Sequence, residues 1–388
     1  MLLPIVGYAH CPACPLRGVQ LDAQNTSTKN LDAAKNAGFN FIRQGFYWDK
    51  VERVPGKYDW SYYDDLIAEL DSRNMFAYFT IYAHGRGGGN MTLPGERKGG
   101  ITKWISAAAE RYKNNNVVWE LWNEPNVDRF WPPKSNVDEY VRFANEACEM
   151  IREKDASAVV VAGALAQRSR DTYLKKIIEG QRKNCFSYIS LHPYRGSAPS
   201  SLSKDLISLK GWINGEVNLI NGEWGYPTQG QRSISEQEQG EYAAQMAVVT
   251  AAEGMKYSVW YTLVDRGSNP VDREDNFGLI KSNGDFKPAY SAVSKINLSL
   301  KYRRPIMRCE GGDWSQQAVV FESVKDKSKF IYFWASSKER GGDWRLYYNS
   351  ADKKWRGLNV NARVQPSFIE LKDGLDMAKK CRFEKVDV

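Results

Sequence analysis

Two stretches of the chain end an apolar run with a glutamate close to a tryptophan. The first is VVWELWNEPN at 117–126, which carries Glu124, and the second is NGEWG at 221–225, which carries Glu223. Two carboxylates that meet in space can work as an acid and as a base or nucleophile, and this is the chemistry that cleaves glycosidic bonds. Because sequence spacing does not give their separation, the mechanism depends on the fold that places them.

Eight short apolar runs alternate with segments that have helical signals, and near-continuous apolar runs of this length are typical of buried parallel strands. The expected strands are 2–10, 39–48, 75–84, 117–124, 158–165, 185–194, 217–225 and 257–265. The expected helices are 26–38, 59–74, 101–115, 137–154, 172–180, 203–213, 235–254 and 288–300. Such alternation predicts an α/β fold, the closed (β/α)8 TIM barrel. A doubly wound open sheet is the alternative, but no GxGxxG follows the first expected strand to support it.

The pattern changes after residue 302. Short alternating runs split by turn residues predict a small antiparallel β-sandwich-like domain at 303–388, after a (β/α)8 catalytic barrel at 1–302. This domain can shield the barrel by packing against it, or it can bind glycan through an exposed aromatic ring. The candidates for the second role are Trp314, Trp334, Trp344 and Trp355.

Composition limits the partners of the chain. The net charge is +8, but basic and acidic residues are interspersed, so we expect no nucleic-acid partner; the excess indicates a solvated surface or an acidic polymer as substrate. No apolar run approaches the roughly 18 residues that span a membrane. The N-terminus does not resemble an intact signal peptide. We therefore expect either an intracellular protein or a secreted or periplasmic one whose signal peptide has been removed.

In a barrel of this kind, functional groups collect at the carboxyl ends of the strands. Reading the strand ends in order gives Arg43, His84, Asn123, Glu124, His192, Tyr194, Glu223 and Trp260. The glutamates that end the fourth and seventh strands are expected to face each other across the barrel mouth. A separation of about 5 Å means a covalent intermediate with retention of configuration, and about 6.5–9.5 Å means inversion.

These motifs resemble the retaining glycoside hydrolases of clan A, over the whole expected barrel. The resemblance is carried by W-N-E-P-N and by the later glutamate that ends an apolar strand before a tryptophan. It implies that Glu124 is the acid/base, that Glu223 is the nucleophile, and that Asn123 binds the sugar 2-hydroxyl. It also implies that Arg43 and Tyr194 lie near the nucleophile.

Two families of the clan share further features with the chain. The family 5 pattern of Arg, His, His-x-Tyr and Trp on strands two, three, six and eight is matched by Arg43, His84, His192, Tyr194 and Trp260. The resemblance makes Trp260 the platform under the cleaved sugar. The stretches at 46–67 and 274–293, and the small β domain, are more similar to family 39.

Several side chains have a structural interpretation beside the functional one. His84 and His192 contact substrate, or they are core histidines; because the spacing of Asp and Glu residues suggests no metal site, we expect neither a metal nor another cofactor. Glu120 shares the strand parity of Glu124, so we expect a buried, paired acid. The candidate sugar platforms are Trp48, Trp122, Trp131, Trp224 and Tyr226, with Trp131 expected to wall a cleft. Cys11 and Cys14 are expected to form a local disulfide or to remain thiols.

Taken together, the sequence predicts a retaining glycoside hydrolase that acts on a β-linked oligo- or polysaccharide. We expect endo action on a β-glucan, mannan, xylan or exopolysaccharide. The alternatives are an exo-acting β-glycosidase on short oligosaccharides, a non-catalytic glycan-binding barrel and a metal-dependent barrel enzyme.

Overall fold

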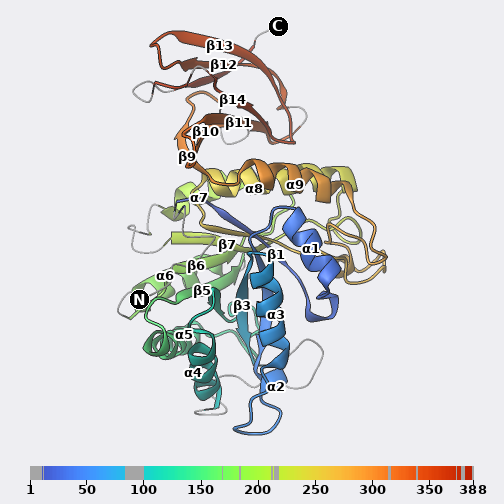
Figure 1. Ribbon diagram of the computed structural model, residues 1–388, viewed down its shortest axis with the longest axis vertical. Coiled ribbons are helices and arrows are strands. Elements are labelled where there is room, and N and C mark those ends of the chain that lie inside the picture. Colours follow the sequence, from blue (N-terminus) through green and yellow to red (C-terminus); the bar gives the residue numbers. More distant parts are fainter. Residues whose placement is uncertain are drawn as a thin grey trace.

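The computed structural model of the chain is an eight-stranded parallel barrel surrounded by helices, followed by two antiparallel sheets (Figure 1). It describes residues 11, 13–83, 100–167, 169–182, 185–210, 213, 218–312, 316–337, 340–372, 374–376 and 381–386. Within these ranges, no helix is long and apolar enough to cross a membrane.

The expected (β/α)8 barrel is confirmed. Its strands are β1 (Leu16–Gln20), β2 (Phe41–Tyr47), β3 (Phe76–Tyr82), β4 (Val117–Leu121), β5 (Val159–Ala166), β6 (Tyr188–His192), β7 (Asn218–Trp224) and β8 (Tyr257–Trp260). Its helices are α1 (Thr28–Asn36), α2 (Trp48–Val51), α3 (Ser61–Ser72), α4 (Gly100–Tyr112), α5 (Val137–Lys154), α6 (Arg170–Gly180), α7 (Ser201–Lys210), α8 (Glu236–Ala252) and α9 (Pro288–Ser299). Two short 3-10 helices, η1 (Ala23–Asn25) and η2 (Arg273–Asp275), lie in loops.

The first barrel strand differs from the prediction. β1 pairs with both β2 and β8, so the barrel closes without the run at 2–10, which lies outside the described residues. The prediction of 2–10 as the first barrel strand is therefore wrong. The sequence of β1, LRGVQ, does not read as a strand because Arg17 and Gln20 interrupt the apolar pattern. Gly18 is needed here, since a Cβ would lie 2.0 Å from the Phe41 ring.

The barrel interior changes from apolar to polar along its axis. Its apolar layer is formed by Phe41, Phe76, Tyr78, Val118, Val161, Ile220, Tyr257 and Val259. Because side chains alternate along a strand, Arg43 and Glu120 point inward two residues beyond Phe41 and Val118. The polar layer therefore begins where the strands approach their carboxyl ends.

The C-terminal part consists of two antiparallel sheets, as expected. One sheet has the order β14-β11-β10-β9 and the other the order β13-β12-β15. The strands are β9 (Arg303–Arg308), β10 (Gln316–Ser323), β11 (Lys329–Ala335), β12 (Gly342–Asn349), β13 (Trp355–Ala362), β14 (Ser367–Glu370) and β15 (Arg382–Lys385).

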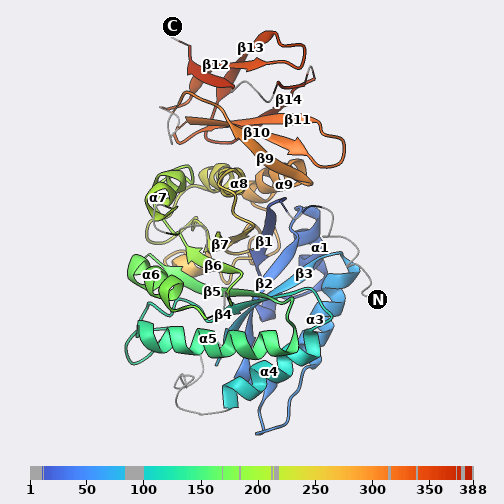
Figure 2. The same ribbon diagram turned by 90° about the vertical axis from the view of Figure 1, so that its left-hand side faces the viewer.

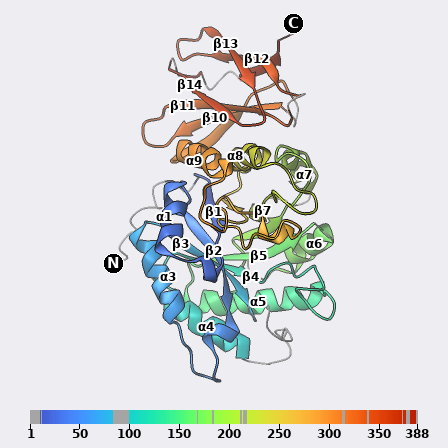
Figure 3. The ribbon, with the colours of Figure 1, turned by 90° about the vertical axis from the view of Figure 1, so that its right-hand side faces the viewer.

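The four-stranded sheet packs on α8 and α9, which lie between it and the barrel in all three views (Figure 2, Figure 3). Gln245 on α8 is fully buried there, and its Nε2 donates to the carbonyls of Ala335 at 2.8 Å and Val364 at 2.9 Å. Trp334 and Tyr332 of β11 belong to the same apolar core as the barrel helices. The sheet is thus part of the wall of the barrel domain.

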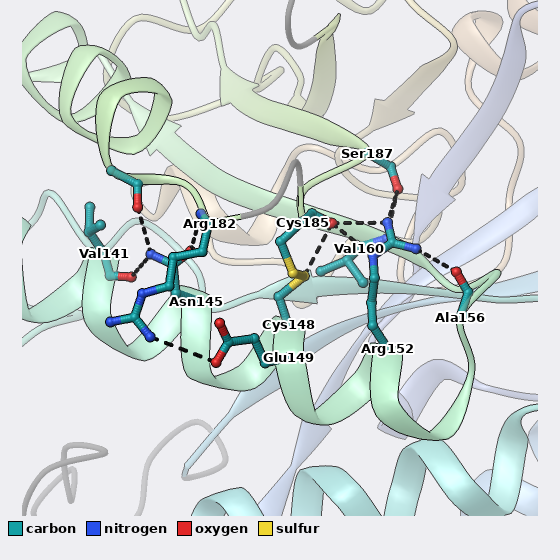
Figure 4. Close-up of a disulfide and its surroundings, with 11 residues drawn as sticks. Val141, Asn145, Cys148, Glu149, Arg152, Ala156, Val160, Arg182, Cys185 and Ser187 are labelled. Carbon is teal, nitrogen blue, oxygen red and sulfur yellow. Dashed lines mark hydrogen bonds and ion pairs between the residues drawn. A yellow bond between two sulfur atoms is a disulfide. The ribbon is translucent and has the colours of Figure 1, made fainter.

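All six cysteines are paired, as Cys11–Cys14, Cys148–Cys185 and Cys309–Cys381. Figure 4 shows the second bridge, which joins α5 to the segment before β6. Arg152 donates from Nε and Nη2 to the carbonyl of Cys185 at 3.0 and 2.9 Å. The disulfide and the Arg152 side chain therefore both hold the backbone at Cys185 against α5.

Candidate active site

Glu124 is placed by an irregular turn immediately after β4. Trp122 and Glu124 adopt positive φ angles of 76° and 46°, a region that costs side-chain-bearing residues on the order of 1–2 kcal/mol each. Neighbouring contacts hold this turn. The N–H of Glu124 donates to the carbonyl of Ala164 at 3.0 Å, and Asn126 forms two hydrogen bonds with the backbone of Ala166. The carboxylate is thereby fixed at the barrel mouth.

Arg43 joins the two strands that carry the glutamates. Its Nε and Nη2 donate to one oxygen of Glu120 at 2.9 and 2.7 Å, and its Nη1 donates to Glu223 at 2.7 Å. Its Nη2 also donates to Oδ1 of Asn123 at 2.9 Å. Burial alone lowers the pKa of Arg43, but the charges of Glu120 and Glu223 outweigh it and raise the pKa above its ordinary value. The guanidinium is a permanent cation beneath the site.

Glu120 is the buried, paired acid that its strand parity predicts. It is fully buried, and besides Arg43 it accepts hydrogen bonds from the hydroxyls of Tyr78 and Thr80, both at 2.8 Å. A buried carboxylate is tolerated only with such complete pairing. Its role here is to orient Arg43.

Glu223 is held from two sides. Oε2 accepts from Arg43, and Oε1 accepts from the hydroxyl of Tyr194 at 2.9 Å. Burial, and then the charge of Glu223, raise the pKa of Tyr194 well above its ordinary value, so this phenol is a neutral donor. The carboxylate keeps 13% of its surface exposed, so it remains open to the barrel mouth.

The two glutamates lie close together. Glu124 contacts Nδ1 of His192 at 2.9 Å, and single atoms of Glu124, His192 and Glu223 all lie within 4.8 Å of one another. This limit on their oxygens agrees with the carboxyl separation of about 5 Å in retaining hydrolysis, and it is shorter than the 6.5–9.5 Å or so of inverting hydrolysis. Three such ligand groups could also meet at a divalent cation, although the Arg43 cation next to Glu223 opposes one.

Two neighbouring side chains escaped the sequence prediction. Gln20, at the end of β1, accepts from Nη1 of Arg43 at 2.9 Å. Tyr82, at the end of β3, hydrogen-bonds to Asn123, and burial, then the charge of Glu124, raise its pKa well above its ordinary value. Both stand at strand ends, so reading inward positions strand by strand could have found them.

The structure brings together Arg43, Asn123, Glu124, His192, Tyr194 and Glu223 from the predicted set. It does not place Trp131 or Trp260 with them. Trp131 is 2% exposed and packs edge-on against Trp122 and Tyr140, so the predicted cleft wall is a core residue. Trp260 is 1% exposed and belongs to the layer between strands and helices. The predicted platform role is therefore wrong for both residues, and His84 lies outside the described residues.

The other predicted platforms are buried as well. Trp48, Trp122, Trp224 and Tyr226 are 7%, 0%, 0% and 2% exposed, respectively. Tyr261, one residue after Trp260, is the ring that reaches the site, and its centroid lies 6.2 Å from that of Tyr194. The prediction failed because a strand sends successive side chains to opposite faces, and the inward position lies one residue later.

Comparisons with known proteins agree with this fold. In a sequence match to a curated protein, the chain is 29% identical over 98 residues to "Endoglucanase A" of Butyrivibrio fibrisolvens; the match covers 25% of this chain and about a fifth (20%) of that protein. Among solved structures, the fold resembles a family 39 glycoside hydrolase of Bacteroides cellulosilyticus WH2, with a TM-score of 0.72 and 19% identity over 93% of this chain and 81% of that one. It also resembles a GH39 β-xylosidase of Caulobacter crescentus, with a TM-score of 0.58 and 16% identity over 87% and 82% of the two chains.

The family assignment rests on a match between the sequence and a protein-family model. The model described as Cellulase (glycosyl hydrolase family 5) matches residues 8–263, more than half of the chain. It spans the strands that carry Glu124 and Glu223, and the fold agrees with the clan A resemblance of the sequence. The chain belongs to glycosyl hydrolase family 5 and is a clan A glycoside hydrolase.

Proposed function

We propose that the chain hydrolyses a β-linked polysaccharide by double displacement, with Glu223 as nucleophile and Glu124 as acid/base. The observation that carries this assignment is that a carboxylate oxygen of Glu124 lies within 4.8 Å of one of Glu223. The two carboxylates also differ in surroundings. Glu223 has two hydrogen-bond donors, one of them a guanidinium, whereas Glu124 contacts an imidazole. The first environment favours a carboxylate anion.

In the first step a Glu223 oxygen bonds to the anomeric carbon while the glycosidic bond breaks, and Glu124 gives its proton to the leaving oxygen. In the second step Glu124 takes a proton from water, the water oxygen bonds to the anomeric carbon, and the bond to Glu223 breaks. Tyr194 and Arg43 hold the nucleophile in place. In this proposal Asn123, which accepts a hydrogen bond from Arg43, binds the sugar 2-hydroxyl.

We propose endo action on the polysaccharide. The family description Cellulase and the partial match to a protein named Endoglucanase A support it. Exo action is the second candidate, because similar folds include a protein titled exo-β-1,4-mannosidase, from Opitutaceae bacterium strain TAV5. A product profile on β-glucan, mannan, xylan and an acidic exopolysaccharide separates the two. A ladder of oligosaccharides supports endo action, and release of a single sugar from chain ends overturns it.

The catalytic roles are tested with Glu223→Gln and Glu124→Gln. Both variants should lose on the order of 10³-fold or more in kcat on the polysaccharide, since nucleophile or acid assistance is gone. On an aryl glycoside with a good leaving group, Glu124→Gln should still form the glycosyl-enzyme, whereas Glu223→Gln should not. Glu69→Gln on the surface of α3 is the matched control. An initial product of inverted configuration in NMR would refute double displacement.

We also propose that the protein is secreted or periplasmic. Its three disulfides support this location, because disulfides persist in oxidising compartments. A polysaccharide substrate outside the cell demands the same location. Thiol alkylation of the freshly isolated, denatured protein should add no mass before reduction and six labels after it. Labelling of all six cysteines without reduction would contradict the proposal.

A further inference from the structure

The three-stranded sheet of the C-terminal domain has one buried and one open face. Trp344, Leu346, Tyr348, Val360 and Phe383 pack into the core between the two sheets. Because side chains alternate, the opposite face carries Asp343, Arg345 and Tyr347 of β12, Trp355, Gly357, Asn359 and Asn361 of β13, and Arg382 and Glu384 of β15. Figure 1 and Figure 2 show β12 and β13 on the side of the domain farthest from the barrel.

Aromatic rings and guanidinium groups alternate on this open face. Trp355 is 50% exposed, and the guanidinium of Arg382 lies 5.8 Å from its ring centroid. Arg345 lies 5.3 Å from the ring of Tyr347, and Tyr347 is the direct cross-strand neighbour of Arg382. We call Arg345, Tyr347, Trp355 and Arg382 the Trp355 face.

Gly357 keeps the Trp355 face flat. A Cβ at this position would lie 3.1 Å from Nε of Arg345 and 3.5 Å from Cε1 of Tyr347. The bare glycine therefore lets the Arg345 side chain lie along the sheet against the tyrosine ring. A flat, laterally extended surface of this kind suits a chain of sugar rings rather than a compact ligand.

Charge on this sheet is unbalanced. Residues 342–362 and 382–385 contain six basic and three acidic residues. Asp352 pairs with Lys354 and Arg356, and Asp343 accepts from Asn361. The third acid, Glu384, is the cross-strand neighbour of Arg345 on the open face. In the described part of the chain, Arg345 and Arg382 contact rings and form no ion pair with a carboxylate. Their guanidinium groups can therefore donate hydrogen bonds to carboxylates of a ligand.

We propose that the Trp355 face binds a polysaccharide strand that carries carboxylate groups. Trp355 and Tyr347 stack on sugar rings, and Arg345 and Arg382 pair with uronate carboxylates. This site is separate from the barrel mouth and does not require the catalytic assignment. It gives the C-terminal domain a role in holding the enzyme on an acidic polymer.

The test is native affinity electrophoresis of the full chain in gels that contain sodium alginate, a polyuronate, or a neutral β-glucan. A Glu223→Gln background prevents cleavage of the polymer, and about 0.15 M salt screens weak surface attraction. Alginate should retard the protein and the neutral glucan should not. Trp355→Ala and the double variant Arg345→Ala/Arg382→Ala should each weaken retardation at least tenfold. Lys175→Ala on α6 and Phe286→Ala, both exposed positions, are the matched controls.

Three results would overturn the proposal. These are equal retardation by the neutral polymer, unchanged retardation of the Trp355→Ala variant, and stronger binding to single-stranded DNA than to alginate, which would assign the face to nucleic acid. In the chain with Glu223 intact, Trp355→Ala should hydrolyse an aryl glycoside at the wild-type rate. Failure of the Trp355 face and failure of the barrel chemistry are thus seen in different assays.

Discussion

The guanidinium of Arg43 lies 2.7 Å from Glu223 while its other nitrogens contact Glu120, so one buried cation sets the positions of two carboxylates from different strands. A lysine has a single ammonium and cannot span both. Arg43→Lys should therefore lower kcat about 100-fold with little change in KM, because misplacement of the nucleophile acts on the transition state. Steady-state kinetics measures kcat and KM of the variant, and circular dichroism checks that it is folded. A kcat within twofold of wild type would contradict the role of Arg43 in positioning Glu223.

Tyr194→Phe removes one hydrogen bond to Glu223 and little else. A hydrogen bond to a charged group contributes about 1.5–3 kcal/mol, so kcat/KM should fall about 10- to 150-fold. The melting temperature should stay close to wild type, since the ring packing against Tyr261 is retained. Tyr290→Phe, whose hydroxyl bonds to a backbone carbonyl far from the mouth, is the control. Equal kinetics in the two variants would contradict this role.

Trp131→Ala should damage the fold rather than substrate binding. The residue is buried among Trp122, Tyr140 and Phe143, and loss of a core aromatic costs about 3–5 kcal/mol. Denaturant unfolding should show this decrease, while KM of the folded fraction stays within twofold. A large rise in KM with unchanged unfolding free energy would restore Trp131 as a sugar platform.

Lys287 and Asp265 form a buried ion pair at 2.9 Å in the segment after β8. Burial raises the pKa of Asp265 and lowers that of Lys287, so each charge depends on the other. Lys287→Met should reduce the unfolding free energy by about 3–5 kcal/mol, because it leaves a buried carboxylate without its partner. Asp265→Asn/Lys287→Met should recover part of the loss. A single variant as stable as wild type would show that the pair is solvated.

Chelation should leave hydrolysis unchanged. Double displacement needs only the two carboxylates, and the space around Glu223 is occupied by the guanidinium of Arg43. Activity of protein dialysed against EDTA, compared with protein given excess Ca²⁺ or Zn²⁺, checks this. Activity that disappears with EDTA and returns with one ion would instead assign Glu124, His192 and Glu223 to a metal centre.

The sequence predicted the barrel well because strand and helix patterns are local. It also predicted the pairing of Glu120, because strand parity is a local property. It missed β1 because Arg17 breaks the apolar run, and the burial of Arg17 comes from contacts with distant parts of the chain.

The aromatic platforms and the cysteine pairs could not be predicted in the same way. A tryptophan has the same sequence signature in a cleft as in a core, and Trp260 differs from Tyr261 only by the face of the strand. Cys148 meets Cys185 only because α5 packs beside the segment leading into β6. Both depend on tertiary packing.

The fully buried amide of Gln245 reaches from α8 to the carbonyl of Ala335 in β11 and to that of Val364 between β13 and β14. A protein cut at residue 302 would expose this amide together with the apolar surfaces of α8 and α9. In a chimaeric enzyme, the barrel and the C-terminal sheets should therefore be transferred together, as the whole chain. Replacing the barrel while keeping the β domain would require both sides of the interface between α8, α9 and the C-terminal sheets to be redesigned together.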